Sequence, residues 1–309
     1  DIPLQARLYT EISFNHSSMG NQKKDITSVE KAIDLMESNF DKIKLMDYIA
    51  AYNNLFYYYG EYEDNLGIKT TFLKFNTFYK AQFIRPSNTP EYYYAKRVYR
   101  KMQVNVAIVN EDLVLANKIV QQIKNEIQLS PPNEKLADIN YYLSCITLLC
   151  DYYNYYSDNH TEGVRLGKMY LAEAIKYEDP FSMVLAHSKL ANQYREMKEY
   201  KQAIYHVNAS LQAFEFPPTS MSKFGLETMK AMNLSSLAMH DSAIAIMEMN
   251  INTLIEIQLG KKIPLLEVDE QKLLDLNNNR YVNIFISSAL IYNDAFKKTR
   301  QQSFIQKSE

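Results

Sequence analysis

Apolar residues recur at helical spacing along most of this 309-residue chain. One stretch carries Tyr200, Ala203, Ile204, Val207, Leu211 and Phe214. Lys201, Gln202, His206 and Gln212 fall on the other side. Spacings of i, i+3, i+4 and i+7 place these side chains on one face of an α-helix. The pattern returns at Ile26–Phe40, Ala116–Ile127 and Ile244–Leu254, and no stretch alternates as a strand would. The sequence predicts an all-α fold.

Helix breakers punctuate the stripes at regular intervals. Thr89-Pro90 and Asp179-Pro180 each have the form of an N-cap residue followed by proline in the first turn. Thr27 and Glu30 have the spacing of a capping box. Between the prolines, the helical pattern is also interrupted without a proline, near residues 60, 110, 157–161, 198 and 240. An interruption with proline therefore alternates with one without proline. This alternation predicts a helical hairpin that is repeated along the chain.

Composition narrows the possible functions. The 34 basic and 36 acidic residues give a net charge of −2 and are interspersed. Because no basic run is long enough to follow a phosphate backbone, we expect no direct binding of nucleic acid. The most apolar late stretch, 282–292, is too short to cross a bilayer. Cys145 and Cys150 fall on different helix faces, which predicts two buried free thiols.

One segment carries a family pattern. In Ala186–Leu211 the pair Leu190-Ala191, the aromatic residues Tyr194 and Tyr200, and the small Ala203 stand in tetratricopeptide order. The segment resembles a tetratricopeptide repeat. The resemblance implies a right-handed superhelical array of antiparallel helix pairs, an α-solenoid in which a small residue at position 203 lets two helices approach closely.

The other units match this pattern less closely. The expected counterparts of Ala203 are Ala32, Asn65, Ala116, Gly167 and Ala243, and their uneven spacing indicates lengthened helices. We expect about six helix pairs in residues 1–263. Residues 264–309, with Leu273, Leu274, Leu276, Tyr281 and Phe285, are expected to form a capping helix and tail.

No catalytic motif is present. The chain lacks GxxxxGK[ST], GxGxxG, GxSxG and HExxH, and its five histidines are scattered. We therefore expect a protein that is not an enzyme and that binds no metal and no cofactor.

The resemblance also indicates where a ligand would bind. Tetratricopeptide arrays bind ligands on a concave face lined by the first helix of each pair. Aligned on Ala203, that face would carry a peptide or protein through Asn54, Tyr58, Lys101, Asn105, Asn192 and Arg195, with Tyr156 alongside. Asparagine suits an extended backbone because its amide both donates and accepts. The alternative is ordinary solvated helix surface. The 25 tyrosines have two possible roles: they pack between neighbouring helices, or they line this concave face.

Three functions remain open. The chain resembles the extracytoplasmic sensor regions of Bacteroidetes histidine kinases and related regulators, which implies a periplasmic input domain, tethered to a membrane by a region after residue 309. The second is a free-standing cytoplasmic peptide-binding adaptor. The third, a glycan-binding lipoprotein, is disfavoured because the chain has no tryptophan. A homodimer is compatible with each.

Overall fold

The computed structural model describes residues 2–18, 22–83, 85–129, 136–217, 220–261 and 279–299. These residues form thirteen α-helices and one short 3-10 helix, and none of them lies in a strand. This confirms the predicted all-α class. The chain divides into two compact units, Asp1–Leu149 and Cys150–Glu309. Residues 262–278 lie outside the described ranges, and with them the predicted boundary at 263/264.

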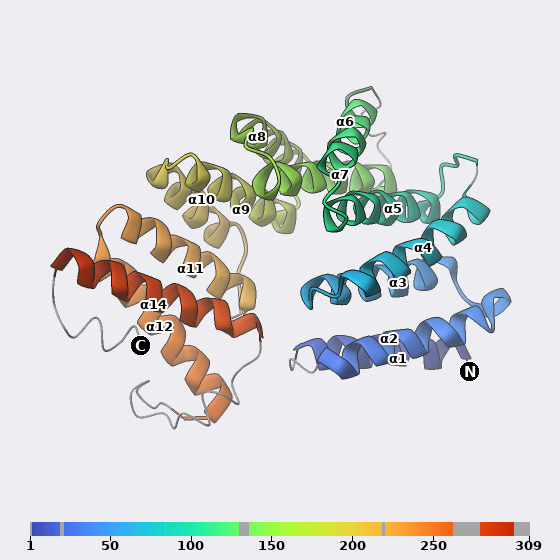
Figure 1. Ribbon diagram of the computed structural model, residues 1–309, viewed down its shortest axis with the longest axis horizontal. Coiled ribbons are helices and arrows are strands. Elements are labelled where there is room, and N and C mark those ends of the chain that lie inside the picture. Colours follow the sequence, from blue (N-terminus) through green and yellow to red (C-terminus); the bar gives the residue numbers. More distant parts are fainter. Residues whose placement is uncertain are drawn as a thin grey trace. The chain divides into compact units, whose positions relative to one another are not determined.

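The first unit is built from consecutive helices that pack on their neighbours (Figure 1). The contacts join α1 to α2, α2 to α3, α3 to α4, α4 to α5 and α5 to α6, and the first helices α3 and α5 also touch each other. The bounds are α1 Ile2–Ser18, α2 Gln22–Glu37, α3 Leu45–Glu61, α4 Asn65–Gln82, α5 Pro90–Val109, α6 Leu113–Leu129 and α7 Leu136–Tyr155, which ends in the second unit.

Within the second unit, consecutive helices also pack on their neighbours. Each helix from α8 to α12 contacts the next through α8–α9, α9–α10, α10–α11 and α11–α12, and α14 covers both α11 and α12. The bounds are α8 His160–Lys176, α9 Pro180–Glu196, α10 Tyr200–Ala213, α11 Met221–Ser236, α12 His240–Leu259 and α14 Asn279–Thr299. Leu273, Leu274 and Leu276 of the expected capping segment lie outside the described residues.

The predicted apolar stripes become the core. Val29, Ile33 and Met36 of α2 are buried, as are all five residues of the α6 stripe: Ala116, Ile119, Val120, Ile123 and Ile127. The prediction that Phe40 belongs to the α2 stripe is wrong, because Phe40 lies in a 3-10 turn beyond the helix and is 37% exposed. Cys145 and Cys150 are buried and free, as predicted. Burial raises the pKa of each thiol to about 12.

Both proline caps are confirmed. Thr89 accepts a hydrogen bond from the backbone N–H of Tyr92, and Asp179 accepts from Phe181 and Ser182. The predicted capping box at Thr27 is wrong, because α2 begins at Gln22 and both Thr27 and Glu30 lie inside it. The Glu30 carboxylate instead accepts a hydrogen bond from the hydroxyl of Tyr59 at 2.7 Å.

The same type of turn joins consecutive helices at five places in the described residues. It marks the helix pairs more clearly than the spacing of small residues in the sequence does. In α9–α10, Lys198 has φ 61°, its N–H bonds the Arg195 carbonyl at 2.8 Å, and the N–H of Glu199 bonds the Tyr194 carbonyl at 2.8 Å. This pair of bonds is a Schellman motif. The residues at the left-handed position are Glu63, Glu111, Glu178, Lys198 and Ala238. None of the five is the glycine that this conformation favours.

Small residues allow the close helix contacts, but one of the expected counterparts of Ala203 does not lie at such a contact. Ala32, Ala116, Ala203 and Ala243 are fully buried. Asn65, however, is exposed in the first turn of α4. The close approach there uses Gly67, where an added Cβ would lie 2.3 Å from the Tyr59 ring.

Candidate ligand-binding surface

Four predicted ligand residues lie on the adjacent first helices of unit 1. Asn54 and Tyr58 belong to α3, while Lys101 and Asn105 belong to α5. Lys101 and Asn105 are spaced by four residues and therefore share a helix face. Asn54 has the same spacing to Tyr58, whose side chain lies in the core. Asn54, Lys101 and Asn105 are half-buried. The Lys101 ammonium lies near an aromatic ring of α3.

Tyr58 does not belong to this surface. Its side chain is 4% exposed and lies in the hydrophobic core of unit 1. The preceding residue, Tyr57, is 45% exposed, and the Lys101 Nζ lies 5.7 Å from the centroid of its ring. Consecutive helix residues differ by about 100° in direction. The sequence alignment therefore chose the wrong member of the tyrosine cluster, and Tyr57 is the aromatic neighbour of Lys101.

Sequence reasoning missed Arg97, which lies one turn before Lys101 on α5. Arg97, Lys101 and Asn105 are spaced four residues apart, and we call them the α5 polar row. The Arg97 guanidinium lies 4.6 Å from the Tyr94 ring centroid, and its Nη1 donates to Ser144 Oγ of α7 at 3.3 Å. The i−4 spacing from Lys101 was the available signal.

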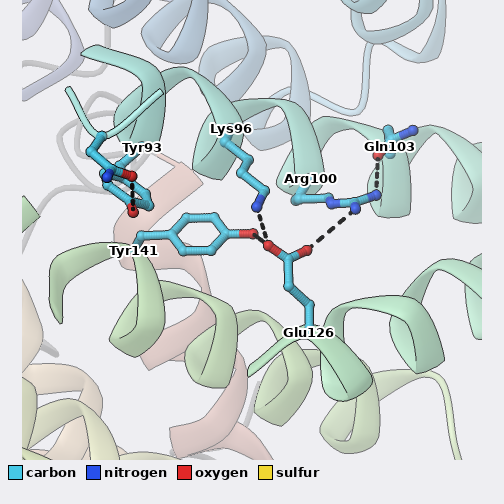
Figure 2. A network of polar contacts seen from close by, with 7 residues as sticks. Tyr93, Lys96, Arg100, Gln103, Glu126 and Tyr141 are labelled. Atoms are coloured by element: carbon cyan, nitrogen blue, oxygen red, sulfur yellow. Dashed lines mark hydrogen bonds and ion pairs between the residues drawn. The ribbon is translucent and has the colours of Figure 1, made fainter. Parts of the chain in front are cut away.

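A second polar cluster lies around Glu126 of α6 (Figure 2). Glu126 accepts a hydrogen bond from the Tyr141 hydroxyl at 2.9 Å, pairs with Lys96, and lies 3.4 Å from Arg100. Burial acts to raise the pKa of this carboxyl, but the hydrogen bond and charge of Lys96 outweigh it and the pKa is lowered. The cluster holds α5, α6 and α7 together with an ionised carboxylate at its centre.

The remaining predicted residues lie in unit 2. Tyr156 follows the end of α7 and is 44% exposed, with its ring 6.4 Å from that of Tyr152. Asn192 and Arg195 of α9 are half-buried. The Arg195 guanidinium is 3.0 Å from the Glu196 carboxylate, so part of its charge is balanced locally. The seven predicted residues thus divide four to three between units that are each described by themselves.

Other polar contacts surround the unit 2 residues on α9. The Lys189 ammonium pairs with the Asp151 carboxylate of α7. His187, also on α9, forms a hydrogen bond with His206 of α10. His206 had been placed on the polar face of its helix, but it is only 8% exposed because the rings of His187 and Tyr194 cover it.

The tyrosine clusters divide between core and surface. Tyr152 and Tyr153 are buried, whereas Tyr155 and Tyr156 are exposed. Helical geometry separates neighbouring residues in this way. Only the exposed members are accessible to a ligand without a change in packing.

Across the parts of the chain that the structure describes, no three His, Cys, Asp or Glu side chains converge to hold a metal ion. No described helix combines the length and apolar character needed to span a bilayer.

Comparison with known proteins supports the fold through structure alone. No protein-family model matches the chain, and no curated protein matches its sequence. Among solved structures, the chain is similar to NprR in complex with its cognate peptide NprX, with a TM-score of 0.52 and 14% identity. The likeness covers 96% of this chain and 76% of that chain. At this identity it establishes a tetratricopeptide-like helical-repeat fold.

Proposed function

We propose that this chain is a non-catalytic binding domain that recognises a peptide, or an extended segment of a protein, on the first helices of its pairs. One observation carries the proposal: the similarity to NprR, a structure solved with a peptide, extends over 96% of this chain. Helical-repeat arrays commonly bind ligands along an extended surface of this kind.

The polar side chains of these helices support a peptide ligand. Asn54 and Asn105 in unit 1, and Asn192 in unit 2, are half-buried on first helices. An asparagine amide pairs with the N–H and C=O of an extended backbone whatever its side chains are. Core packing does not require an amide at these positions. Their recurrence is therefore better explained by backbone recognition.

The cellular setting is a separate part of the proposal. We propose that the domain is the periplasmic input region of a signalling protein of the Bacteroidetes two-component type, with a cytoplasmic peptide-binding adaptor as the alternative. The full-length gene distinguishes them. A signal peptide, a transmembrane helix and an output domain would support the sensor, and a stop codon soon after residue 309 without a signal peptide would favour the adaptor.

Peptide binding is tested by panning a library of short random peptides against the purified chain. Affinities of the selected peptides are then measured by titration calorimetry for the wild type, Asn105→Ala and Asn192→Ala. Each variant should lose about 1 kcal/mol of binding free energy or more, because a paired amide is removed.

The matched controls are Asn117→Ala on α6 and Asn252→Ala on α12, two exposed asparagines on second helices. Both controls should bind as the wild type does. The proposed surface is wrong if the controls lose as much affinity as the two first-helix variants do.

A further inference from the structure

Two histidines of unit 2 bring their ring nitrogens close together. The Nδ1 atoms of His187 on α9 and His206 on α10 lie 2.9 Å apart. One ring donates its Nδ1–H, so the other presents an unprotonated nitrogen. Imidazole in this unprotonated form is the commonest metal ligand among protein side chains. The two residues are 19 positions apart, and only the packing of α9 on α10 makes them neighbours.

Aromatic contacts hold the two rings in place. The His206 ring stacks on Tyr194 with centroids 5.4 Å apart, and it meets Tyr205 edge-on at 5.1 Å. His206 is 8% exposed, whereas His187 is half-buried, so the pair is reached from the side of His187. Ligands that are already held lose less conformational entropy when they bind an ion.

The separation of the two nitrogens indicates which ions fit between them. An imidazole nitrogen lies about 2.0–2.1 Å from a bound divalent transition-metal ion. Two such nitrogens at a right angle are about 2.9 Å apart, and at the tetrahedral angle they are about 3.4 Å apart. Right angles belong to the square-planar and tetragonal geometry of Cu²⁺ and Ni²⁺, whereas Zn²⁺ prefers the tetrahedral angle. The observed 2.9 Å matches the right-angled geometry.

We propose that His187 and His206 bind a divalent transition-metal ion of right-angled coordination, Cu²⁺ or Ni²⁺, through their Nδ1 atoms. Water supplies the other ligands from the side of His187. Both rings stay neutral with their protons on Nε2, so the ring that donates in the free protein moves its proton from Nδ1 to Nε2. A bound ion joins α9 to α10. The site is independent of the proposed peptide surface.

A nearby positive charge gives the proposal an additional check. The charge of Lys168, an exposed residue of α8, acts on His206 and opposes the binding of a cation there. Lys168→Gln removes this repulsion and should tighten binding at the histidine pair about twofold at low salt, the size expected for an exposed charge. An ion bound elsewhere on the chain would not respond to this substitution.

The first experiment is a calorimetric titration of the purified chain, without a histidine tag, with Ni²⁺. Ni²⁺ is chosen because it does not oxidise the free thiols of Cys145 and Cys150. The wild type should bind one ion. His187→Gln and His206→Gln should each weaken binding about tenfold or more, since even the loss of an outer partner of a metal ligand costs that much. His187 is half-buried, so its variant keeps the test valid if His206→Gln folds poorly.

The matched control is His160→Gln on α8, which removes another half-buried histidine of unit 2. His160 bonds Gln193 rather than a second histidine, so this variant should bind Ni²⁺ as the wild type does. Electron paramagnetic resonance with one equivalent of Cu²⁺ should show coupling to two imidazole nitrogens in the wild type and to fewer in His187→Gln.

Three results would overturn the site. They are the absence of Ni²⁺ and Cu²⁺ binding to the wild type, equal binding by the wild type and both variants of the pair, and tighter binding of Zn²⁺ than of Ni²⁺. The third would show that the rings separate to a tetrahedral angle. None of these results bears on peptide binding, so the proposed function is tested separately.

Discussion

The Nδ1 atoms of His187 and His206 lie 2.9 Å apart where α9 packs against α10. One ring donates its Nδ1–H to the Nδ1 of the other, so the accepting ring must be unprotonated at that nitrogen. The His206 ring also stacks on Tyr194, with centroids 5.4 Å apart and planes 6° from parallel, and meets Tyr205 edge-on. Burial lowers the pKa of both histidines, and that of His206 falls to about 4, with smaller contributions from the charges of His187 and Lys168.

This pair predicts a loss of stability in mild acid. The pKa of His206 is depressed in the folded chain, so the unfolded chain binds more protons between its ordinary pKa of about 6.5 and the folded value. The contribution is fully present above about pH 6.5 and is lost as pH falls towards 4, by on the order of 2–3 kcal/mol. Urea unfolding at pH 7.5 and 4.5 measures the change. His206→Gln should show a shallower decline, and an equal decline in both proteins would refute the assignment.

The contact between α9 and α10 depends on Ala203, which is fully buried. Ala203→Leu would push the helices apart and should lower the free energy of unfolding by about 1–3 kcal/mol, the usual cost of overpacking. Gln202→Leu adds the same side chain at the adjacent exposed position and should change stability by less than about 0.5 kcal/mol. An unchanged denaturant midpoint for Ala203→Leu would contradict the repeat register.

The left-handed residue of the α9–α10 turn predicts a stabilising substitution. Lys198 has φ 61°, a conformation that costs an L-residue about 1 kcal/mol or more relative to glycine. Lys198→Gly should therefore raise the free energy of unfolding by about 1 kcal/mol. Lys118→Gly, in the exposed middle of α6, should lower it by about the same amount. Chemical denaturation compares the three proteins, and destabilisation by Lys198→Gly would show that its side chain has a role that the turn geometry does not reveal.

A buried amide in α7 predicts a second stabilising substitution. The Asn154 side chain is 8% exposed, and neither its Oδ1 nor its Nδ2 has a hydrogen-bond partner among the described residues. Asn154→Leu keeps the number and branching of the side-chain heavy atoms and removes the desolvation cost, so the free energy of unfolding should rise by about 1–3 kcal/mol. Thermal and urea unfolding measure the effect. A drop in stability would mean that a water molecule or another polar group satisfies the amide in solution.

Residue spacing and capping signals were sufficient to predict the helices and most of their buried faces. Val29, Ile33 and Met36 are buried as the 3.6-residue period requires, and the caps at Thr89 and Asp179 were readable because capping is local chemistry. Asn54, Lys101 and Asn105, which alignment on Ala203 assigns to the concave face, are half-buried. Whether these residues bind a ligand stays a prediction.

Tertiary structure alone decided which helix faces are covered and which charges meet. His206 lies on the polar side of its own helix, yet it is buried because α9 places His187 and Tyr194 over it. Tyr58 is buried and Tyr57 exposed because α3 is covered on the side that Tyr58 faces. The Arg97 guanidinium of α5 meets the Ser144 hydroxyl of α7, a contact that residue spacing within α5 does not reveal. The apolar period of a helix shows which of its side chains share a face. The side chains that contact this face belong to other helices, about 15 to 50 residues away in the sequence. The pattern of a single helix carries no information about which helix that is.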